Sequence, residues 1–413
     1  MAQVNITLSQ DEVLQVITGN RDEALKFLLE RIMNAIMQAE SEEQLGAARY
    51  ERTSERTDSR NGTRERELNT RIGTLTLEVP RHRNEPFHTM IFENYSRSEA
   101  SLIATMVQMV IAGVSTRKVE KVVETLCGTS FSKSTVSSLC KRLDEEVAAF
   151  RNRSLEYMDA PFLMVDATYF KVREDHRVRS KAFLVALAFR ADGHREVAGF
   201  GVYDTEDNYS WRMFFEDLKS RGLKSVKLVI SDAHKAIRRA IAEVYPTVAW
   251  QRCQVHLLRN IMEVTPPKYK EGLKTELREM FTAQTLEKAR TKKEEIVREY
   301  QAEAAKAMDI LESGFEDAMT VMCLPEYIRI VMRSTNILER LNRELKRRSD
   351  VIGVFPNPDS VLRLIGTVTI EYSDSENTKQ RLYSERSFEE LRDDIAGKLS
   401  AIGISQEKLL KAA

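Results

Sequence analysis

The chain has 413 residues, of which 42% are hydrophobic and 31% are charged, and its 63 Lys and Arg balance 63 Asp and Glu. This length is enough for two to four domains, each with its own core. No stretch approaches the roughly 18 apolar residues of a membrane-spanning helix, so we expect no membrane partner. Four scattered cysteines (Cys127, Cys140, Cys253 and Cys323) form no disulfide framework, which predicts a reducing, cytoplasmic compartment. Because the net charge is zero, any binding of nucleic acid has to depend on local basic patches.

The N-terminal part is expected to begin with helices and to continue as a polar segment. Residues 1–49 are interpreted as a helical region for dimerisation or DNA binding, with a Ser9–Glu12 capping box and an amphipathic run after Asn20. Residues 50–71 are polar and rich in arginine, which fits either a solvated linker or an extended arm along a DNA backbone. The alternation in 72–83 predicts a short edge strand or hairpin ended by Pro80, within a region spanning 50–95. The DNA-binding candidates of the arm are Arg52, Arg56, Arg60, Arg64 and Arg66.

Residues 96–152 carry a pattern of three helices. A capping box at Ser96 and Glu99 opens the first, Gly113 and Ser115 separate it from the second, and Gly128 separates the second from a third over 131–150. Two helices joined by a short turn, the second with polar and basic residues on its exposed side, resemble a helix-turn-helix. A plain three-helix bundle with solvated serines explains the same pattern. In the DNA-binding interpretation the contacts come from Lys133, Ser134, Thr135, Ser137, Ser138 and Lys141.

From residue 161 onwards strand and helix signals alternate, which predicts a mixed α/β fold. The order is β-β-β-α-β-α-β, a mixed sheet closed by helices. The predicted strands are 162–170, 181–190, 195–204, 226–232 and 248–253. Charged helices interrupt this pattern over 265–325, as an all-helical insertion that serves either as a spacer or as a DNA-facing surface. The predicted domains of this part are therefore a catalytic domain (153–264 and 326–375), the insertion (265–325) and a C-terminal helical tail (376–413).

Asp166 stands in the middle of the apolar strand PFLMVDATYFKVR, where an ionised carboxylate needs compensation. A second carboxylate, Asp232, ends the strand KLVISD just before a helix. If the first and fourth strands are neighbours, the two aspartates project toward one point, and they repel each other unless a cation lies between them. Oxygen ligands of this kind suit Mg²⁺ or Mn²⁺.

A third acid is expected from the amphipathic helix 334–349. Its apolar stripe contains Ile337, Leu338, Leu341 and Leu345, and Glu339 lies on the flank among amides and cations. Asn336 shares that flank, whereas Glu344 falls on the other one. Glu339 is therefore the better candidate for a ligand, although a surface glutamate paired with Arg343 fits the same spacing.

Two aspartates on strands and a glutamate on a late helix are the arrangement of ribonuclease-H-like enzymes, which transfer phosphoryl groups with two metal ions. The chain resembles bacterial insertion-sequence transposases of the mutator type, which carry a DDE catalytic triad. The resemblance rests on an ordered set of motifs along nearly the whole chain: FENYSRSEASL, VDATYFKVR, NYSWRMFFEDLKSRGL, LVISDAHKAI, WQRCQVHLLRN and STNILERLNRELKRRSDVIGVFPN. It implies that Asp166, Asp232 and Glu339 are both catalytic residues and metal ligands, with two Mg²⁺ ions that Mn²⁺ can replace.

Cys253 and His256 match a further motif of that family. By itself, C-x-x-H could be half of a zinc site, but no second pair lies at zinc-ligand spacing. We expect His256 to lie beside the active site, where it orients a carboxylate or touches the scissile phosphate. A buried structural cysteine with a hydrogen-bonded histidine is the other interpretation. Trp211 and Trp250 are expected in the core, and His234 at the surface or next to the site.

The resemblance implies a DNA transposase that binds the terminal inverted repeats of its element, cuts there and joins the freed end to target DNA. Because two ends must be held together, we expect a homodimer or higher oligomer in the bacterial cytoplasm, associated with the nucleoid. DNA phosphates near the cut are expected to contact Arg343, Lys346, Arg347 and Arg348. Two other functions fit parts of the sequence: a helix-turn-helix regulator, and a ribonuclease-H-like nuclease without strand transfer.

Overall fold

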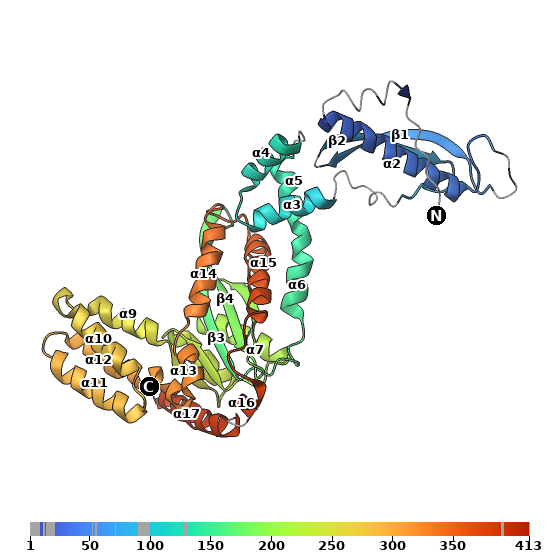
Figure 1. Ribbon diagram of the computed structural model, residues 1–413. Coiled ribbons are helices and arrows are strands. Elements are labelled where there is room, and N and C mark those ends of the chain that lie inside the picture. The colour runs from blue at the N-terminus through green and yellow to red at the C-terminus, as the bar shows by residue number, and fades with distance from the viewer. Residues whose placement is uncertain are drawn as a thin grey trace. The chain divides into compact units, whose positions relative to one another are not determined.

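The computed structural model describes residues 9, 10, 13, 21–51, 53, 56–70, 72–89, 100–127, 131–389 and 392–412. The chain forms two compact units, residues 1–141 and 142–413, and each is described by itself (Figure 1). Within the described residues, no helix combines the length and the apolar character needed to cross a membrane.

The N-terminal unit begins with a long helix that packs on a two-stranded sheet. These elements are α2 (Arg21–Leu45), β1 (Arg60–Thr70) and β2 (Gly73–His82). Every second residue of β2 from Leu75 to Val79 is buried against α2, as the alternating sequence predicts. The strand continues past Pro80, because the pairing with β1 is irregular between Arg60 and Thr63 and a proline is tolerated at a bulge.

The arginine-rich segment is therefore a strand over residues 60–70, not an unpaired linker. Only Leu68 and Thr70 of β1 are buried, so the sequence shows little alternation of apolar and polar residues that would predict a strand. The extended conformation of this segment is fixed by its hydrogen bonds with β2. The open end of the hairpin is held by Asp58. Its carboxylate accepts hydrogen bonds from the backbone N–H groups of Ser59, Asn84 and Glu85 at 2.6–3.0 Å.

Three further helices of this unit share a small core. They are α3 (Ala100–Ile111), α4 (Thr116–Cys127) and α5 (Lys133–Leu139). Ser132 caps α5 by accepting the N–H of Thr135 at 3.1 Å. The predicted third helix is interrupted, because a turn of 3₁₀ helix at Cys140–Arg142 separates α5 from α6 (Leu143–Asn152), which belongs to the second unit.

The second unit is built on a five-stranded mixed sheet in the order β5-β4-β3-β6-β7. The strands are β3 (Phe162–Glu174), β4 (Arg177–Phe189), β5 (Arg195–Tyr203), β6 (Leu228–Ser231) and β7 (Ala249–Arg252). β4 runs antiparallel to both of its neighbours, β3 and β5, whereas β6 runs parallel to β3 and β7 parallel to β6. The first and fourth strands are thus neighbours, and the predicted mixed α/β class is confirmed.

Helices cover both faces of this sheet. One face packs against α7 (Asn208–Ser220) and α8 (Lys235–Val244) around Trp211 and Trp250, which are core residues as predicted. The other face lies against α14 (Asn336–Ser349) and α15 (Pro358–Asn377), which run side by side in Figure 1. α6 packs on α15.

Between β7 and α14 the chain forms a separate helical core. Its helices are α9 (Gln254–Val264), α10 (Lys270–Phe281), α11 (Leu286–Tyr300) and α12 (Ala305–Ala318). A short helix, α13 (Glu326–Met332), leads back to α14. The predicted insertion is therefore helical, with its core also using Leu257 and Ile261 of α9.

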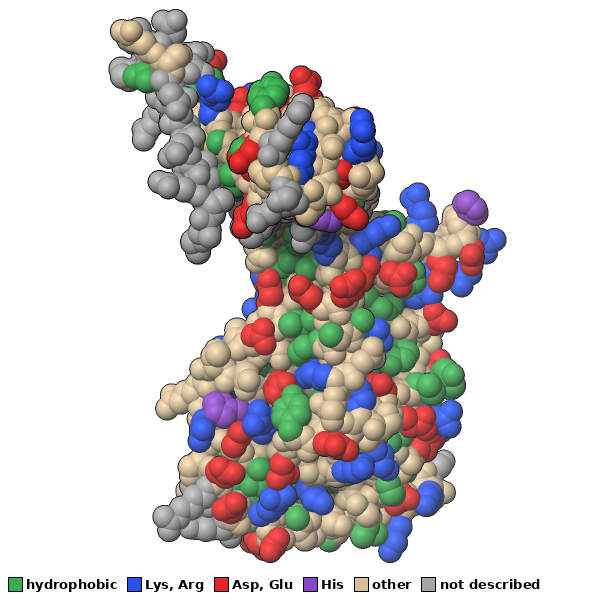
Figure 2. Space-filling view, turned by 90° about the vertical axis from the view of Figure 1, so that its right-hand side faces the viewer, with side chains coloured by type: hydrophobic (Ala, Val, Ile, Leu, Met, Phe, Trp, Pro, Cys, Tyr) green, Lys and Arg blue, Asp and Glu red, His purple; other side chains and the backbone are tan. Residues whose placement is uncertain are grey.

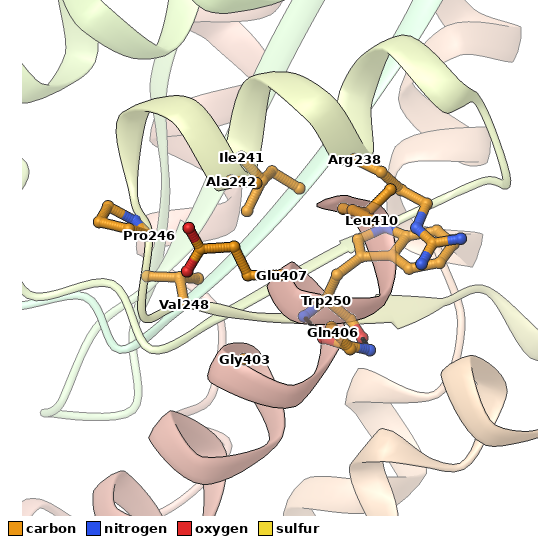
Figure 3. Close-up of a pocket in the computed structure, with 10 residues that line it drawn as sticks. All are labelled: Arg238, Ile241, Ala242, Pro246, Val248, Trp250, Gly403, Gln406, Glu407 and Leu410. Atoms are coloured by element: carbon orange, nitrogen blue, oxygen red, sulfur yellow. Dashed lines mark hydrogen bonds between the residues drawn. The ribbon is translucent and has the colours of Figure 1, made fainter. Parts of the chain in front are cut away.

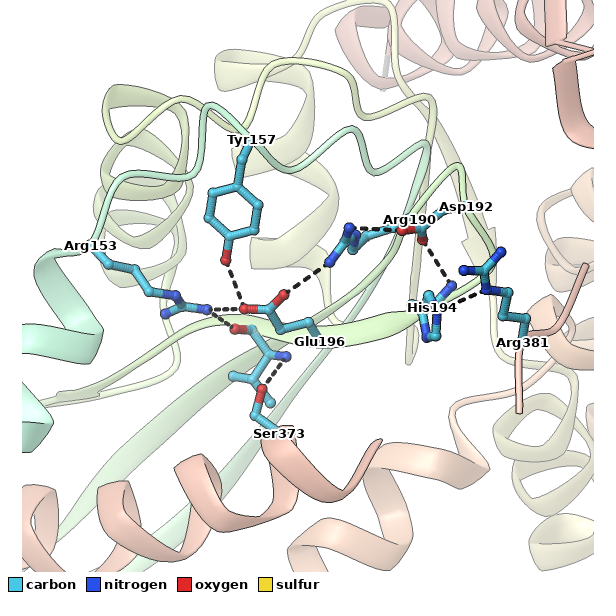
Figure 4. Close-up of polar contacts among 9 residues, drawn as sticks. Arg153, Tyr157, Arg190, Asp192, His194, Glu196, Ser373 and Arg381 are labelled. Carbon is cyan, nitrogen blue, oxygen red and sulfur yellow. Dashed lines mark hydrogen bonds and ion pairs between the residues drawn. The ribbon is translucent and has the colours of Figure 1, made fainter. Parts of the chain in front are cut away.

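Both edges of the sheet are covered by side chains of C-terminal helices. At β5, the N–H of Val197 donates to Ser373 of α15, and Glu196 accepts hydrogen bonds from Arg153 and Tyr157 (Figure 4). At β7, Gln406 of α17 (Arg392–Ala412) accepts from the N–H and donates to the carbonyl of Trp250, both at 2.8 Å, beside a small pocket (Figure 3). A short helix, α16 (Glu385–Glu389), precedes α17. Unpaired strand edges are liable to pair with other chains, and these contacts occupy them.

Candidate active site

The register of β3 and β6 brings Asp166 and Asp232 to the same level. The parallel pairs run from Phe162–Leu228 to Met164–Ile230. Asp166 follows two residues later in β3, and Asp232 follows two residues later in the chain, directly after the end of β6 at Ser231. Since residues level with each other in a sheet point to the same face, both carboxylates lie on the face of Met164 and Ile230. This is the face that α14 and α15 cover.

The carboxyl group of Asp166 is strongly perturbed. Its pKa is raised to about 7, chiefly by burial and also by the negative charges of Asp232 and Glu206, against the lowering effects of the Ala167 N–H and His256. The Ala167 N–H donates to Oδ1 at 2.9 Å. A nearby cation would stabilise the ionised form of this carboxylate, as expected from the sequence for an aspartate within an apolar strand.

Asn342 of α14 contacts Asp166 from the other side. Its Nδ2 donates to Oδ2 of Asp166 at 2.8 Å, while its own Oδ1 is buried without a hydrogen-bond partner among the described residues. Asn342 is three residues after Glu339, so the two side chains lie on one face of α14. The helix thus carries Glu339 within one turn of the residue that holds Asp166.

Glu339 itself makes its contacts with residues of α9. Its Oε1 lies 3.4 Å from Nε2 of His256 and 3.4 Å from NH2 of Arg259. No hydrogen bond or ion pair joins Glu339 to the two aspartates, and among the described residues no three Asp, Glu, His or Cys side chains are already gathered closely enough to hold a metal ion. The structure therefore brings Asp166 and Asp232 together and leaves Glu339 on the neighbouring helix, facing His256.

Cys253, His256 and Thr335 join the beginnings of α9 and α14. Cys253 is fully buried, and its Sγ accepts from both the N–H and the hydroxyl of Thr335 at 3.4 Å. Burial alone would raise the pKa of the Cys253 thiol, but hydrogen bonds from His256 and Thr335 lower it. The pKa of His256 is raised, first by its hydrogen bond with Cys253 and further by the charges of Cys253, Glu339 and Asp166.

The cysteine therefore anchors a histidine that touches Glu339. A backbone contact also joins the starts of the two helices. The N–H of Gln254, the first residue of α9, donates to the carbonyl of Arg333, which precedes α14, at 2.9 Å. Asn336, also expected near the site, is exposed at the first residue of α14 and its side chain makes no hydrogen bond with a described residue.

Glu206 is a site residue that sequence reasoning missed. It lies in the loop between β5 and α7, where its Oε2 accepts from the Tyr169 hydroxyl at 3.1 Å and its Oε1 lies 3.9 Å from Nδ1 of His234. Burial raises its pKa, His234 lowers it and Asp232 raises it. Because Glu206 directly precedes Asp207, the N-cap of α7, its charge looks in sequence like part of a helix start.

The proposed DNA-binding residues differ in how free their side chains are. In the N-terminal unit, Arg56 and Arg60 donate to backbone carbonyls of the protein, Arg64 is exposed, Arg66 is partly buried, and Arg52 lies outside the described residues. In α5, Ser134 and Thr135 are exposed and hydrogen-bond to Ser132, and Lys133, Ser137, Ser138 and, just after the helix, Lys141 are exposed. In α14, Arg343 and Lys346 are exposed, whereas Arg347 and Arg348 both bind Glu344 at 2.7–2.8 Å.

The face of the molecule in Figure 2 shows Lys and Arg side chains interspersed with Asp and Glu, without a broad field of one sign. Any contact with nucleic acid on this face therefore depends on small groups of cations, as the zero net charge suggested.

Comparison with known proteins gives a consistent result over most of the chain. A family profile described as "Transposase, Mutator family" matches residues 1–378. The chain is 41% identical over 391 residues to the transposase of insertion sequence element IS256 in transposon Tn4001 from Staphylococcus aureus, which covers 94% of this chain and 99% of that protein. It is also 41% identical to the ISRM5 transposase of Rhizobium meliloti (87% of this chain, 90% of that protein) and 37% identical to the IS1081 transposase of Mycobacterium tuberculosis (85% of each).

Proposed function

Because the chain belongs to the Mutator family of transposases, we propose that it is the DNA transposase of a bacterial insertion sequence, with a DDE triad of Asp166, Asp232 and Glu339. In this proposal it binds the terminal inverted repeats of its element, cuts the DNA there and transfers the freed strand to a target. The observation that carries the catalytic part is that Asp166, in β3, lies near Asp232, which directly follows the adjacent parallel strand β6, with the pKa of Asp166 raised to about 7.

The order of the strands supports a ribonuclease-H-like core. Three antiparallel strands are followed by two parallel ones that join the sheet beside the first strand, and helices pack on both faces. The helices α9–α12 lie between β7 and α14, and therefore between the second aspartate and the glutamate, where the resemblance to mutator transposases places the family's insertion. Helices α3, α4 and α5 are the proposed helix-turn-helix module.

The residues present fit Mg²⁺ as a cofactor. The donors are carboxylate oxygens, which hard divalent cations prefer, and the unpartnered Oδ1 of Asn342 is a further buried oxygen next to Asp166. Asp166, Asp232 and Glu339 would hold two ions, with Mn²⁺ as a substitute. When bound, these ions supply activation of the attacking oxygen and stabilisation of charge on the leaving oxygen.

The chain's own residues position this set. Asn342 holds one oxygen of Asp166 while leaving the other to the Ala167 N–H, and His256 holds Glu339 at the start of α14. Arg343 and Lys346, exposed one and two turns after Glu339, are placed to contact the phosphates on either side of the reacting one. Two element ends must be held together for transfer, so we propose that the active form is at least a dimer.

The test is cleavage of a labelled duplex that carries the element's own terminal repeat, in Mg²⁺, Mn²⁺ or EDTA. The expected result is cleavage at the repeat end with either metal, none in EDTA, and joining of the freed strand to a second duplex. Asp166→Asn should abolish cleavage while DNA binding is kept or improved, because it removes a negative charge near the phosphate. Asp309→Asn, at an exposed position of α12, is the matched control.

The two rival functions predict different outcomes. Specific binding of the repeat without cleavage in any metal would indicate a DNA-binding regulator. Cleavage of RNA or branched DNA that is independent of the repeat sequence, without joining, would indicate a nuclease. Unchanged cleavage by Asp166→Asn would show that this aspartate is not a catalytic residue.

A further inference from the structure

The β3–β4 hairpin extends beyond the sheet as a two-stranded ribbon, residues 171–180. The pairing with β5 begins at Ala182 and the parallel pairing with β6 ends at Met164, so neither neighbour reaches this part. The two strands of the ribbon pair in register from Lys171–Ser180 to Glu174–Arg177. Asp175 and His176 close it in the left-handed region, with φ of 48° and 61°, as two-residue hairpin turns require.

The two faces of the ribbon differ in how their charges are used. On one face Arg179 lies 3.8 Å from Glu174, which also binds Lys181 at 2.7 Å, so the carboxylate has cationic neighbours within the protein. On the other face Lys171 and Arg173 are exposed, and neither side chain makes a hydrogen bond or ion pair with any residue the structure describes. Val178 completes this face with 53% of its surface exposed. We name Lys171, Arg173 and Val178 the ribbon face.

The base of the ribbon is fixed to the segment that follows α14. The N–H of Arg173 donates to the carbonyl of Phe355, and the N–H of Phe355 donates to the carbonyl of Lys171, both at 2.8 Å. The tip of the hairpin therefore lies at the C-terminal end of α14, as Figure 1 also shows. Arg343 and Lys346 of α14 are exposed between Glu339 and this end. Because side chains alternate along a strand, Lys171 and Arg173 point to the face of the hairpin opposite to Asp166, so exposed cations lie on both sides of this end of α14.

The distance from the active site follows from the strand itself. At about 3.3 Å per residue, Lys171 and Arg173 lie roughly 16 and 23 Å along β3 from Asp166. On a DNA duplex with a rise of about 3.4 Å, this corresponds to roughly five to seven base pairs.

We propose that the ribbon of residues 171–180 lies in the major groove of the element-end DNA, five to seven base pairs from the cut. Lys171 and Arg173 contact phosphates at the edge of the groove, and Val178 contacts base edges. The major groove accommodates a two-stranded β-ribbon, and the ribbon face offers cations that have no carboxylate partner in the described part of the chain. This inference rests on the proposed function, because it takes the DNA that the active site cuts as its partner.

The experiment compares the double variant Lys171→Gln/Arg173→Gln with Arg179→Gln in full-length protein. Binding to a labelled duplex with the terminal repeat is measured by fluorescence anisotropy over a range of salt concentrations. Loss of two phosphate contacts should weaken binding and reduce the slope of log K against log salt by about 2. Arg179→Gln, on the ion-paired face, should change the slope by much less. Because all three side chains are exposed, the melting temperatures should stay unchanged.

A second measurement locates the contact. Hydroxyl-radical footprinting of the wild-type complex should show protection five to seven base pairs from the cleavage site, which the double variant loses. Unchanged salt slopes, equal losses in the double variant and in Arg179→Gln, or protection that persists in the double variant would each overturn the ribbon contact. Cleavage by the wild type tests the proposed function separately. If the wild type cleaves the repeat but the double variant keeps the wild-type salt slope, only the ribbon contact is refuted. If the wild type neither binds nor cleaves the repeat, the proposed function and the ribbon contact are both refuted.

Discussion

Replacing Asp166 by Asn should stabilise the metal-free protein at pH 8. The raised pKa of Asp166, about 7 against the ordinary 3.8, means that the folded state binds this proton more tightly than the unfolded state. The stability contributed by this group is therefore fully present below about pH 4 and is lost as the pH rises toward 7. About three pKa units at about 1.4 kcal/mol each amount to roughly 4 kcal/mol.

The assay is thermal unfolding in EDTA at pH 4.5 and pH 8. At pH 8 the transition of the unit formed by residues 142–413 should rise by roughly 10 °C in Asp166→Asn, on the basis of about 2–4 °C per kcal/mol for a unit of this size. At pH 4.5 the difference should fall to about 1 kcal/mol, because Asp166 is then protonated in the folded state and ionises only in the unfolded state. Asp309→Asn, on the exposed side of α12, should show neither effect.

Addition of Mg²⁺ should narrow the difference in stability at pH 8. A cation that binds only the folded wild type at a hundred times its Kd adds about 2.7 kcal/mol, and the variant should gain much less, so most of its advantage of roughly 4 kcal/mol should disappear. The reasoning is refuted if Asp166→Asn gains no stability in EDTA at pH 8, or if it gains equally at both pH values. Equal stabilisation of both proteins by Mg²⁺ would show that Asp166 is not a ligand.

Three further outcomes follow from the contacts described above. Gln406→Leu leaves the N–H of Trp250 without its partner, while the Trp250 carbonyl keeps the Thr320 hydroxyl at 3.0 Å. The variant should lower the free energy of unfolding by about 1–3 kcal/mol in urea titrations, whereas the exposed Lys408→Ala should change it little. Since backbone hydrogen bonds lower the pKa of Asp58 from 3.8 to about 2, the N-terminal unit should lose stability from about pH 4 down to about pH 2, measured by circular dichroism, and Asp58→Ala should remove that dependence. His256→Ala should slow metal-dependent cleavage at least tenfold, the effect of about 1.4 kcal/mol, because Glu339 loses its contact at 3.4 Å; a large fall in melting temperature with unchanged cleavage per folded molecule would instead assign His256 to the core.

Local signals in the sequence were sufficient for most of the second unit. Alternation and apolar runs located all five strands of its sheet, because buried strands need β-branched and aromatic residues whatever their neighbours are. The 3.6-residue period of α14 correctly assigned Leu338, Leu341 and Leu345 to the core. The anomaly of a carboxylate within an apolar strand pointed to Asp166, and the family motifs to its transposase membership.

What the sequence left open depends on contacts between residues far apart in the chain. β1 is almost entirely polar, so it is recognisable as a strand only through its pairing with β2. Asn342 meets Asp166 across 176 positions, and the loop carrying Glu206 meets Tyr169 across 37. The exposed face of Lys171 and Arg173 likewise follows from where the neighbouring strands end. Periodicity reports which face of one element is buried, whereas the register between elements is set by the packing of the whole sheet, and only that register decides which charges share a site.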